Sequence, residues 1–136
     1  MTKNFYVRWL LAFIALVAID VLWHRVVFGS WYGANDSVAR VSNGFLAPII
    51  VFILIADVLF SGALLYFAGA VSEKNRNYVL NGALLGLVVV GYFSLCGYAL
   101  IPNWNPAVGV ADVLAGVLEG AAVGWLLKYW SRGITV

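Results

Sequence analysis

Four long apolar segments alternate with short polar stretches along the chain. They run approximately over residues 5–28, 45–70, 78–100 and 106–130. A helix needs about 20 apolar residues, each rising 1.5 Å, to cross the hydrocarbon core of a bilayer. All four segments meet that length. The pattern predicts an all-α integral membrane four-helix bundle, with residues 1–136 forming one transmembrane domain.

The connections after the second and third apolar segments are short. Residues 72–77 are polar and charged, and residues 101–105 read Ile-Pro-Asn-Trp-Asn. Helices joined by so few residues pack as antiparallel neighbours. Asn105 followed by Pro106 is typical of a helix N-cap with proline at the first helical position. We therefore expect two antiparallel hairpins.

Composition supports a membrane protein and excludes several other classes. Hydrophobic residues make up 64% of the chain and charged residues only 10%. A soluble domain carries about 25% charged residues, and one small core could not bury this much apolar surface. A secreted scaffold, a cytosolic enzyme, a coiled coil and a disordered tail are therefore excluded.

The few charges are unevenly distributed. The net charge is +2 and no block of five basic residues exists, so nucleic-acid binding is not expected. With four spans, six basic residues fall at one membrane face and only Arg25 and Arg40 near the other. The six are Lys3, Arg8, Lys74, Arg76, Lys128 and Arg132. The positive-inside rule then predicts a multi-pass membrane protein with both termini in the cytoplasm.

Metal and cofactor chemistry has little support. Cys96 is the single cysteine and His24 the single histidine, which excludes an intrachain disulfide and a two-histidine metal motif. No phosphate-binding loop and no nucleophile-elbow motif is present. We expect neither a metal nor a cofactor.

Four acidic residues lie inside the predicted spans: Asp20, Asp57, Asp112 and Glu119. Acids inside a bilayer are costly and usually face the bundle interior. Counting residues from the outer end places Asp112 and Asp20 roughly 9 and 13 Å deep. Asp57 and Glu119 lie near the midplane, at roughly 18–20 Å. The sequence predicts an outer polar layer, completed by His24 and Arg25, above a midplane carboxyl pair.

Two cationic candidates face these four acids. Arg25 is expected to neutralise Asp20 or Asp112, and His24 can hydrogen-bond Asp20 four residues before it on one helix face. No cation reaches the midplane pair. Burial favours the neutral form of a carboxyl group, so such a pair can exchange a proton for a cation. The structural alternative is that protonated acids serve only as hydrogen-bonding glue between helices.

Glycines repeat at helical spacing in the last two spans. Gly116, Gly120 and Gly124 form a small-residue run on span four, and Gly82 and Gly86 repeat the spacing on span three. Small residues at this spacing allow a neighbouring helix to approach closely. That neighbour is either span three or a second copy of the chain.

The stretch from Leu22 to Tyr32, with Leu22-Trp23 followed by Phe28-Gly29-Ser30-Trp31, resembles a family of small four-span prokaryotic membrane proteins. The run from Gly82 to Gly86, and Asp112 with Gly116 and Gly120, are similar to the third and fourth spans of that family. The family is catalogued only as a domain of unknown function. The resemblance therefore implies a fold and no activity.

Three functions remain open. The first is a small transporter or conduit for protons or cations, expected to work as a homo-oligomer, with Asp57 and Glu119 as coupling acids and Asp20 and Asp112 as an outer relay. The second is an accessory or assembly subunit of a larger membrane complex. The third is an enzyme acting on a lipid or quinone through Asp20, His24 and Asp112, for which no nucleophile–base pairing is evident.

Overall fold

A computed structural model describes residues 3–35, 41–42, 45–46 and 50–132. In chain order its elements are α1 (Lys3–Val21), a π-helical segment (Leu22–Val27), α2 (Gly29–Asn35), β1 (Val41–Ser42), β2 (Phe45–Leu46), α3 (Ile50–Ala63), a second π-helical segment (Leu64–Ala68), α4 (Gly69–Asn75), α5 (Tyr78–Leu100) and α6 (Pro106–Arg132). Within the described residues the only strands are β1 and β2, a two-residue antiparallel pair.

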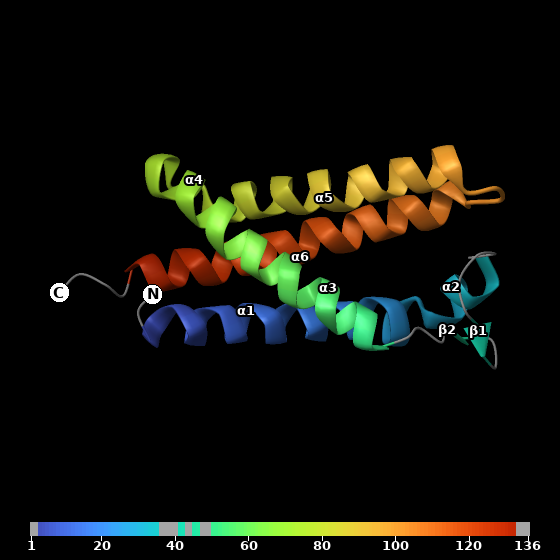
Figure 1. Ribbon diagram of the computed structural model, residues 1–136, viewed down its shortest axis with the longest axis horizontal. Helices are drawn as coiled ribbons and strands as arrows, with labels where there is room; N and C mark the ends of the chain where they lie inside the picture. The colour runs from blue at the N-terminus through green and yellow to red at the C-terminus, as the bar shows by residue number, and fades with distance from the viewer. Residues whose placement is uncertain (1–2, 36–40, 43–44, 47–49, 133–136) are drawn as a thin grey trace.

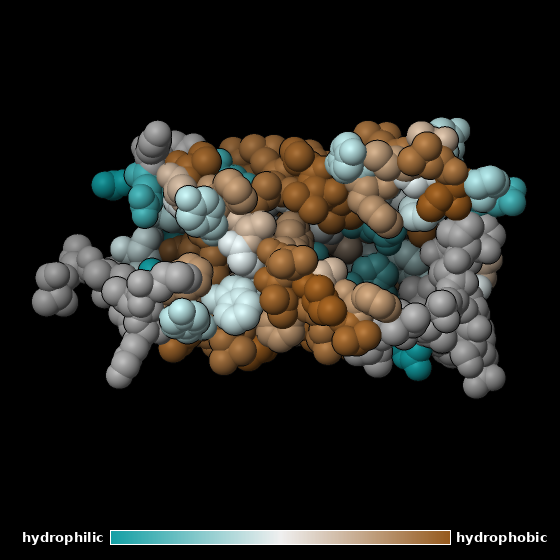
Figure 2. Space-filling model, in the orientation of Figure 1, coloured by the Kyte–Doolittle hydropathy of each residue, from teal (hydrophilic) through white to brown (hydrophobic). Residues whose placement is uncertain are grey.

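Four helices are long and apolar enough to cross a membrane: Phe5–Val27, Val51–Glu73, Tyr78–Leu100 and Pro106–Ser131. Large apolar side chains such as Phe52, Leu59 and Leu95 are exposed on their outer faces. Figure 2 shows this apolar surface along the length of the molecule. An apolar exterior of this extent suits lipid as the surrounding solvent. The expected all-α membrane fold is confirmed.

The second helix begins later in the chain than the hydrophobic pattern predicted. We expected it from residue 45, but α3 begins at Ile50. Phe45 and Leu46 instead pair with Val41 and Ser42 as β2 and β1. Hydropathy alone does not distinguish an apolar strand pair from the first turn of a helix. The helix also continues past the predicted end at residue 70, as far as Asn75.

The helices are arranged as a hairpin and two further spans (Figure 1). Helices α5 and α6 form the antiparallel hairpin, and α1 lies beside α6. Helix α3 contacts α1 at one end and crosses the bundle obliquely, so that α4 reaches the beginning of α5. Lys3 and Arg132, the first and last helical residues, are at the same end of the molecule. Arg40 lies outside the described residues.

Local sequence signals account for the turn between α5 and α6. The side-chain oxygen of Asn105 accepts a hydrogen bond from the Ala107 backbone N–H at 3.0 Å, so Asn105 caps α6 as expected. The Asn105 side-chain amide also donates to the Asn35 carbonyl at 3.0 Å. The same residue therefore starts α6 and ties the end of α2 to it.

Glycines set the close contact between α5 and α6. A Cβ built on Gly82 would overlap the Gly120 carbonyl, and one built on Gly86 would overlap the Gly116 carbonyl. A Cβ on Gly124 would likewise overlap the Tyr78 carbonyl. The neighbour of the glycine run is thus α5 of the same chain. These glycines are buried in the hairpin, so they do not form a face for a second copy.

An apolar core fills the bundle from its middle toward the end that carries the termini. It brings together α1, the second π-helical segment and α6, through Ala12, Leu16, Leu64, Leu65, Ala68, Val123 and Leu127. Trp9, Phe60 and Trp130 pack against this cluster. The polar side chains described next lie toward the opposite end of the bundle.

Candidate functional site

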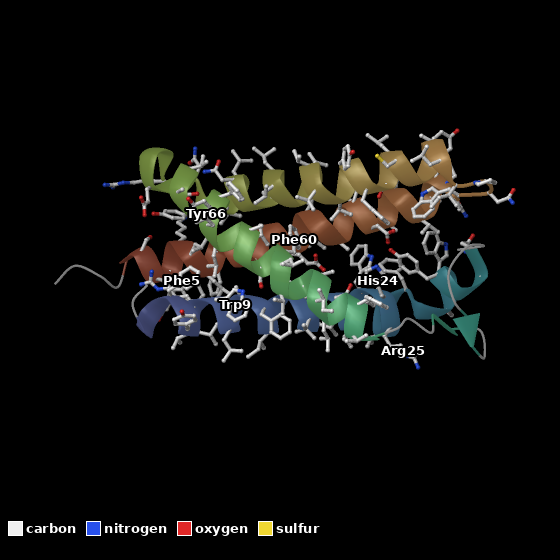
Figure 3. All side chains as sticks on the ribbon, viewed as in Figure 1. Phe5, Trp9, His24, Arg25, Phe60 and Tyr66 are labelled. Atoms are coloured by element: carbon white, nitrogen blue, oxygen red, sulfur yellow. The ribbon has the colours of Figure 1, made fainter. Side chains whose placement is uncertain are left out.

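The imidazole of His24 lies between two carboxylates from different helices. Its Nδ1 is 2.7 Å from an Asp20 oxygen, one turn earlier in the same helical stretch. Its Nε2 is 3.3 Å from Oδ1 of Asp112 on α6. Figure 3 shows His24 in the space between α3 and α6. The ring therefore bridges the first and fourth spans.

The contacts of His24 suit a shared proton. A neutral imidazole has one N–H and can donate to only one carboxylate. For both contacts to be hydrogen bonds, the other ring nitrogen or a carboxyl group must carry a proton. Asp20, His24 and Asp112 together therefore offer several positions for one proton. Such a group can bind, pass or release a proton without a change of fold.

Helix α2 folds back over the cluster and supplies a further donor. The Tyr32 hydroxyl donates to Oδ1 of Asp112 at 2.6 Å and accepts a bond from Nε1 of Trp23 at 3.2 Å. The short distance is typical of a hydroxyl bound to an ionised carboxylate. Burial raises the pKa of Tyr32, and the hydrogen bond to Asp112 raises it further. Tyr32 therefore remains a neutral donor at physiological pH.

The cluster is formed where the first span leaves regular α-helical geometry. Residues Leu22–Val27 are π-helical, and the segment closes with a hydrogen bond from the Phe28 N–H to the Trp23 carbonyl. A π-helical turn is wider than an α-helical one and changes the direction of the side chains on it, and such turns are frequent at functional sites. Both Trp23 and His24 lie on this segment and join the hydrogen-bonded cluster.

Two further acids extend the polar interior toward the centre of the bundle. The Glu119 side chain is only 8% exposed and makes no hydrogen bond to a described residue. Its carboxyl group interacts electrostatically with Asp20, Asp57, His24 and Asp112, so it is directed into the bundle. Oδ2 of Asp57 is buried and has no hydrogen-bond partner among the described residues. The Glu119 side chain and one carboxyl oxygen of Asp57 are therefore shielded from solvent, and neither has a hydrogen bond to a described residue.

Arg25 does not take the place that we expected for it beside Asp20 or Asp112. Its side chain is exposed, and Figure 3 shows it on the opposite side of the first span from His24. The bridge to both carboxylates comes from His24 instead. Successive positions on a helix point in different directions, so the direction that brings His24 into the bundle leaves Arg25 on another face of the segment.

The acids singled out from the sequence thus occupy one half of the bundle interior. Tyr32 and Trp23 were not singled out, although both belong to this cluster. Neither is ionised near neutral pH, so a search for charged residues in spans does not find them. The signal that includes them is the stretch Leu22 to Tyr32, which carries the family resemblance.

The described residues contain no group of three or more His, Cys, Asp or Glu side chains placed to hold a metal ion. The six side chains named above, Asp20, His24, Tyr32, Asp57, Asp112 and Glu119, are hereafter called the polar cluster. Their chemistry is that of proton binding, hydrogen bonding and attraction of positive charge.

The comparisons with known proteins agree with this fold. No curated protein and no solved structure matches the chain. One family model, described as a predicted membrane protein, matches residues 5–129. The matched region includes the first three membrane-length helices, all but the last two residues of the fourth, and the whole polar cluster. The chain therefore belongs to the DUF2177 family of membrane proteins.

Proposed function

We propose that the protein carries protons, in exchange for a cation, through the polar cluster. The observation that carries this proposal is the His24 ring bonded at both nitrogens to carboxylates of two spans. A proton that reaches Nε2 from Asp112 can be matched by one that leaves Nδ1 toward Asp20. The transfer leaves the ring in its other tautomer, and a ring flip that exchanges the two nitrogens restores the first tautomer before the next transfer.

Glu119 and Asp57 are the inner stage of this route. Glu119 is within electrostatic reach of Asp57 and of Asp20, His24 and Asp112. Asp57 is within reach of Asp20 and His24. Oδ2 of Asp57 is buried without a hydrogen-bond partner among the described residues, and the Glu119 side chain is 8% exposed. A buried carboxylate without a hydrogen-bond partner is stabilised by binding either a proton or a cation, so protons and cations compete for it. Competition of this kind couples the movement of one to the other.

The arrangement supports a carrier more than an open channel. Polar groups occupy one half of the bundle, and the apolar cluster of Leu16, Leu64 and Val123 fills the other half. Among the described residues, this apolar half interrupts any continuous path of polar side chains along the bundle. Protons cross such an apolar region poorly. The proposal therefore includes a second conformation that opens the cluster toward the other side of the membrane.

An exposed small-residue face was one of the features that favoured an accessory or assembly subunit of a larger membrane complex, beside the small size of the chain. The glycines that suggested such a face are buried between α5 and α6. A homo-oligomer through these glycines loses its support for the same reason. The distribution of basic residues favours both termini in the cytoplasm. We propose the prokaryotic inner membrane as the location, because the sequence resembles small four-span prokaryotic membrane proteins.

Proton flux in liposomes tests the proposal. Purified protein is reconstituted with an internal pH-sensitive dye, and a proton gradient is applied with potassium and valinomycin present. We expect wild-type protein to dissipate the gradient faster than vesicles without protein. The double variant Asp57→Asn, Glu119→Gln should fall to the rate of empty vesicles, because its two inner sites no longer ionise.

Glu73→Gln is the matched control, because Glu73 is an exposed acid on α4 at the other end of the bundle. It should leave the flux at the wild-type rate. Equal rates for wild type and the double variant, with both proteins incorporated to the same extent, would contradict the proposed function.

A further inference from the structure

The polar cluster is open toward the side of the bundle. Figure 2 shows a hollow between the apolar surface of α3 and that of the α5–α6 hairpin, with hydrophilic residues at its bottom. In the same orientation Figure 3 places His24 in this gap. Helix α3 crosses the bundle obliquely, so it separates from the hairpin toward the end that carries α2 (Figure 1). The hollow follows from this crossing.

The rim of the hollow faces lipid. The helices on its two sides, α3 and α5, are both membrane-length, and their outer side chains Phe52, Leu59, Tyr92 and Leu95 are largely exposed. A molecule that enters between them arrives from the hydrocarbon region. It must therefore carry an apolar body that partitions into the bilayer.

The bottom of the hollow selects for positive charge. The polar cluster contains four carboxyl groups and one imidazole. His24 and Tyr32 already bond Asp20 and Asp112. Glu119 and the buried oxygen of Asp57 have no such partner among the described residues. An anion would be repelled by these two carboxyl groups, and a neutral ligand without a donor would leave them unpaired, whereas a cation is attracted to them.

We propose that the hollow binds a lipophilic organic cation that enters from the lipid between α3 and α5. Its positive group lies beside Asp57 and Glu119, and its apolar body lies against the inner faces of the two helices. This inference rests on the proposed function and deepens it, because it names the class of cation that exchanges for the proton. Protons compete with the cation for Asp57 and Glu119. The charged groups within electrostatic range of Glu119 are Asp57, Asp20, His24 and Asp112, and those of Asp57 include Asp20 and His24.

Equilibrium dialysis of radiolabelled tetraphenylphosphonium against the detergent-solubilised protein tests the inference. We expect saturable binding that weakens as the pH is lowered. Glu119→Gln and Asp57→Asn should each weaken it by about tenfold to a hundredfold, since each removes one charge partner. Glu73→Gln should bind as wild type does. Tetramethylammonium has the same charge without the apolar body, and it should compete at least about tenfold less well.

A measurement on wild-type protein distinguishes the loss of a binding residue from misfolding of the variants. A hydrophobic carbodiimide modifies carboxyl groups in apolar surroundings, and mass spectrometry locates the modified residue. Tetraphenylphosphonium should protect Glu119 and leave the modification of Glu73 unchanged. Binding that is the same in all variants, absence of protection, or equal competition by tetramethylammonium would each overturn the inference.

The two proposals fail separately. Proton flux that depends on Glu119, without tetraphenylphosphonium binding, would remove the organic cation and keep the proton route. Tetraphenylphosphonium binding that depends on Glu119, without proton flux, would keep the lateral site and remove the proposed function.

Discussion

Tyr32 lies on α2, outside the spans, and its side chain connects this helix to Asp112 on α6. Its side chain is 1% exposed, and its hydroxyl connects Trp23 to Asp112. Replacing it with phenylalanine leaves a buried carboxylate with one donor fewer. We expect Tyr32→Phe to lower the free energy of unfolding by about 1–3 kcal/mol, as for other hydrogen bonds to charged groups.

The pH dependence of that loss follows from the raised pKa of Tyr32. Above pH 10 an unfolded tyrosine loses its proton while Tyr32 in the folded chain keeps it. The folded state then binds more protons, so wild-type stability falls with rising pH by about 1.4 kcal/mol per unit. The Tyr32→Phe variant lacks the titrating hydroxyl, so its stability does not fall for this reason. Melting temperatures in detergent should therefore differ most below pH 9 and converge above pH 10. A constant difference from pH 7 to 11 would contradict the assignment.

Part of the polar cluster could be predicted from residue types alone. An acid within a span is conspicuous, and the spacing of Asp20 and His24 follows from one helical turn. The contact between His24 and Asp112 could not be predicted from the sequence, because it depends on which helix packs beside the first span. The prediction that Arg25 lies beside Asp20 or Asp112 was wrong for a related reason. Counting residues along a span gives the depth of a residue in the membrane, but not the direction in which its side chain points from the helix axis.

At the scale of elements, the α5–α6 hairpin depends on the absence of side chains at its contact. Gly86 packs on the Gly116 carbonyl with no room for a Cβ. Gly91 lies on the same helix, but a Cβ there would meet nothing within 4 Å. The two positions form a matched pair of glycines in one helix, one packed and one open.

We expect Gly86→Ala to force the two helices apart and to destabilise the protein by about 1–3 kcal/mol, the usual cost of overpacking. Gly91→Ala should be neutral or stabilise by up to about 1 kcal/mol, because alanine favours the helix. Thermal unfolding of both variants in the same detergent measures the difference. Equal melting temperatures would show that the close approach at Gly86 contributes nothing.

The elements themselves were largely predictable, and their irregularities were not. Length and hydropathy are enough to find four spans, and Asn105-Pro106 marks the start of α6. The π-helical segment at Leu22–Val27 has no comparable sequence mark, because it results from tertiary packing around His24 and Trp23. The later start of α3 at Ile50 was missed because Phe45 and Leu46 are as apolar as a helix would require.

At the scale of the whole molecule, polar and apolar interiors occupy opposite halves. The polar cluster lies toward α2 and the α5–α6 turn, whereas the apolar cluster lies toward the ends of α1 and α6 that carry Lys3 and Arg132. Basic residues Arg8, Lys74, Arg76 and Lys128 also belong to the latter half by their positions in the chain. The side of the membrane that reaches the polar cluster therefore depends on the orientation of the bundle.

Reporter fusions measure that orientation. The positive-inside rule favours the end with the basic residues in the cytoplasm, and four spans return the chain to the side where it began. In a bacterial host we expect a fluorescent protein fused after Val136 to fold and fluoresce, and alkaline phosphatase at the same position to be inactive. Phosphatase inserted after Asn103, in the α5–α6 turn, should be active. Protons would then reach the polar cluster from outside the cell. An active phosphatase after Val136 would reverse the direction of the proposed exchange, and opposite locations for the two termini would exclude four spans.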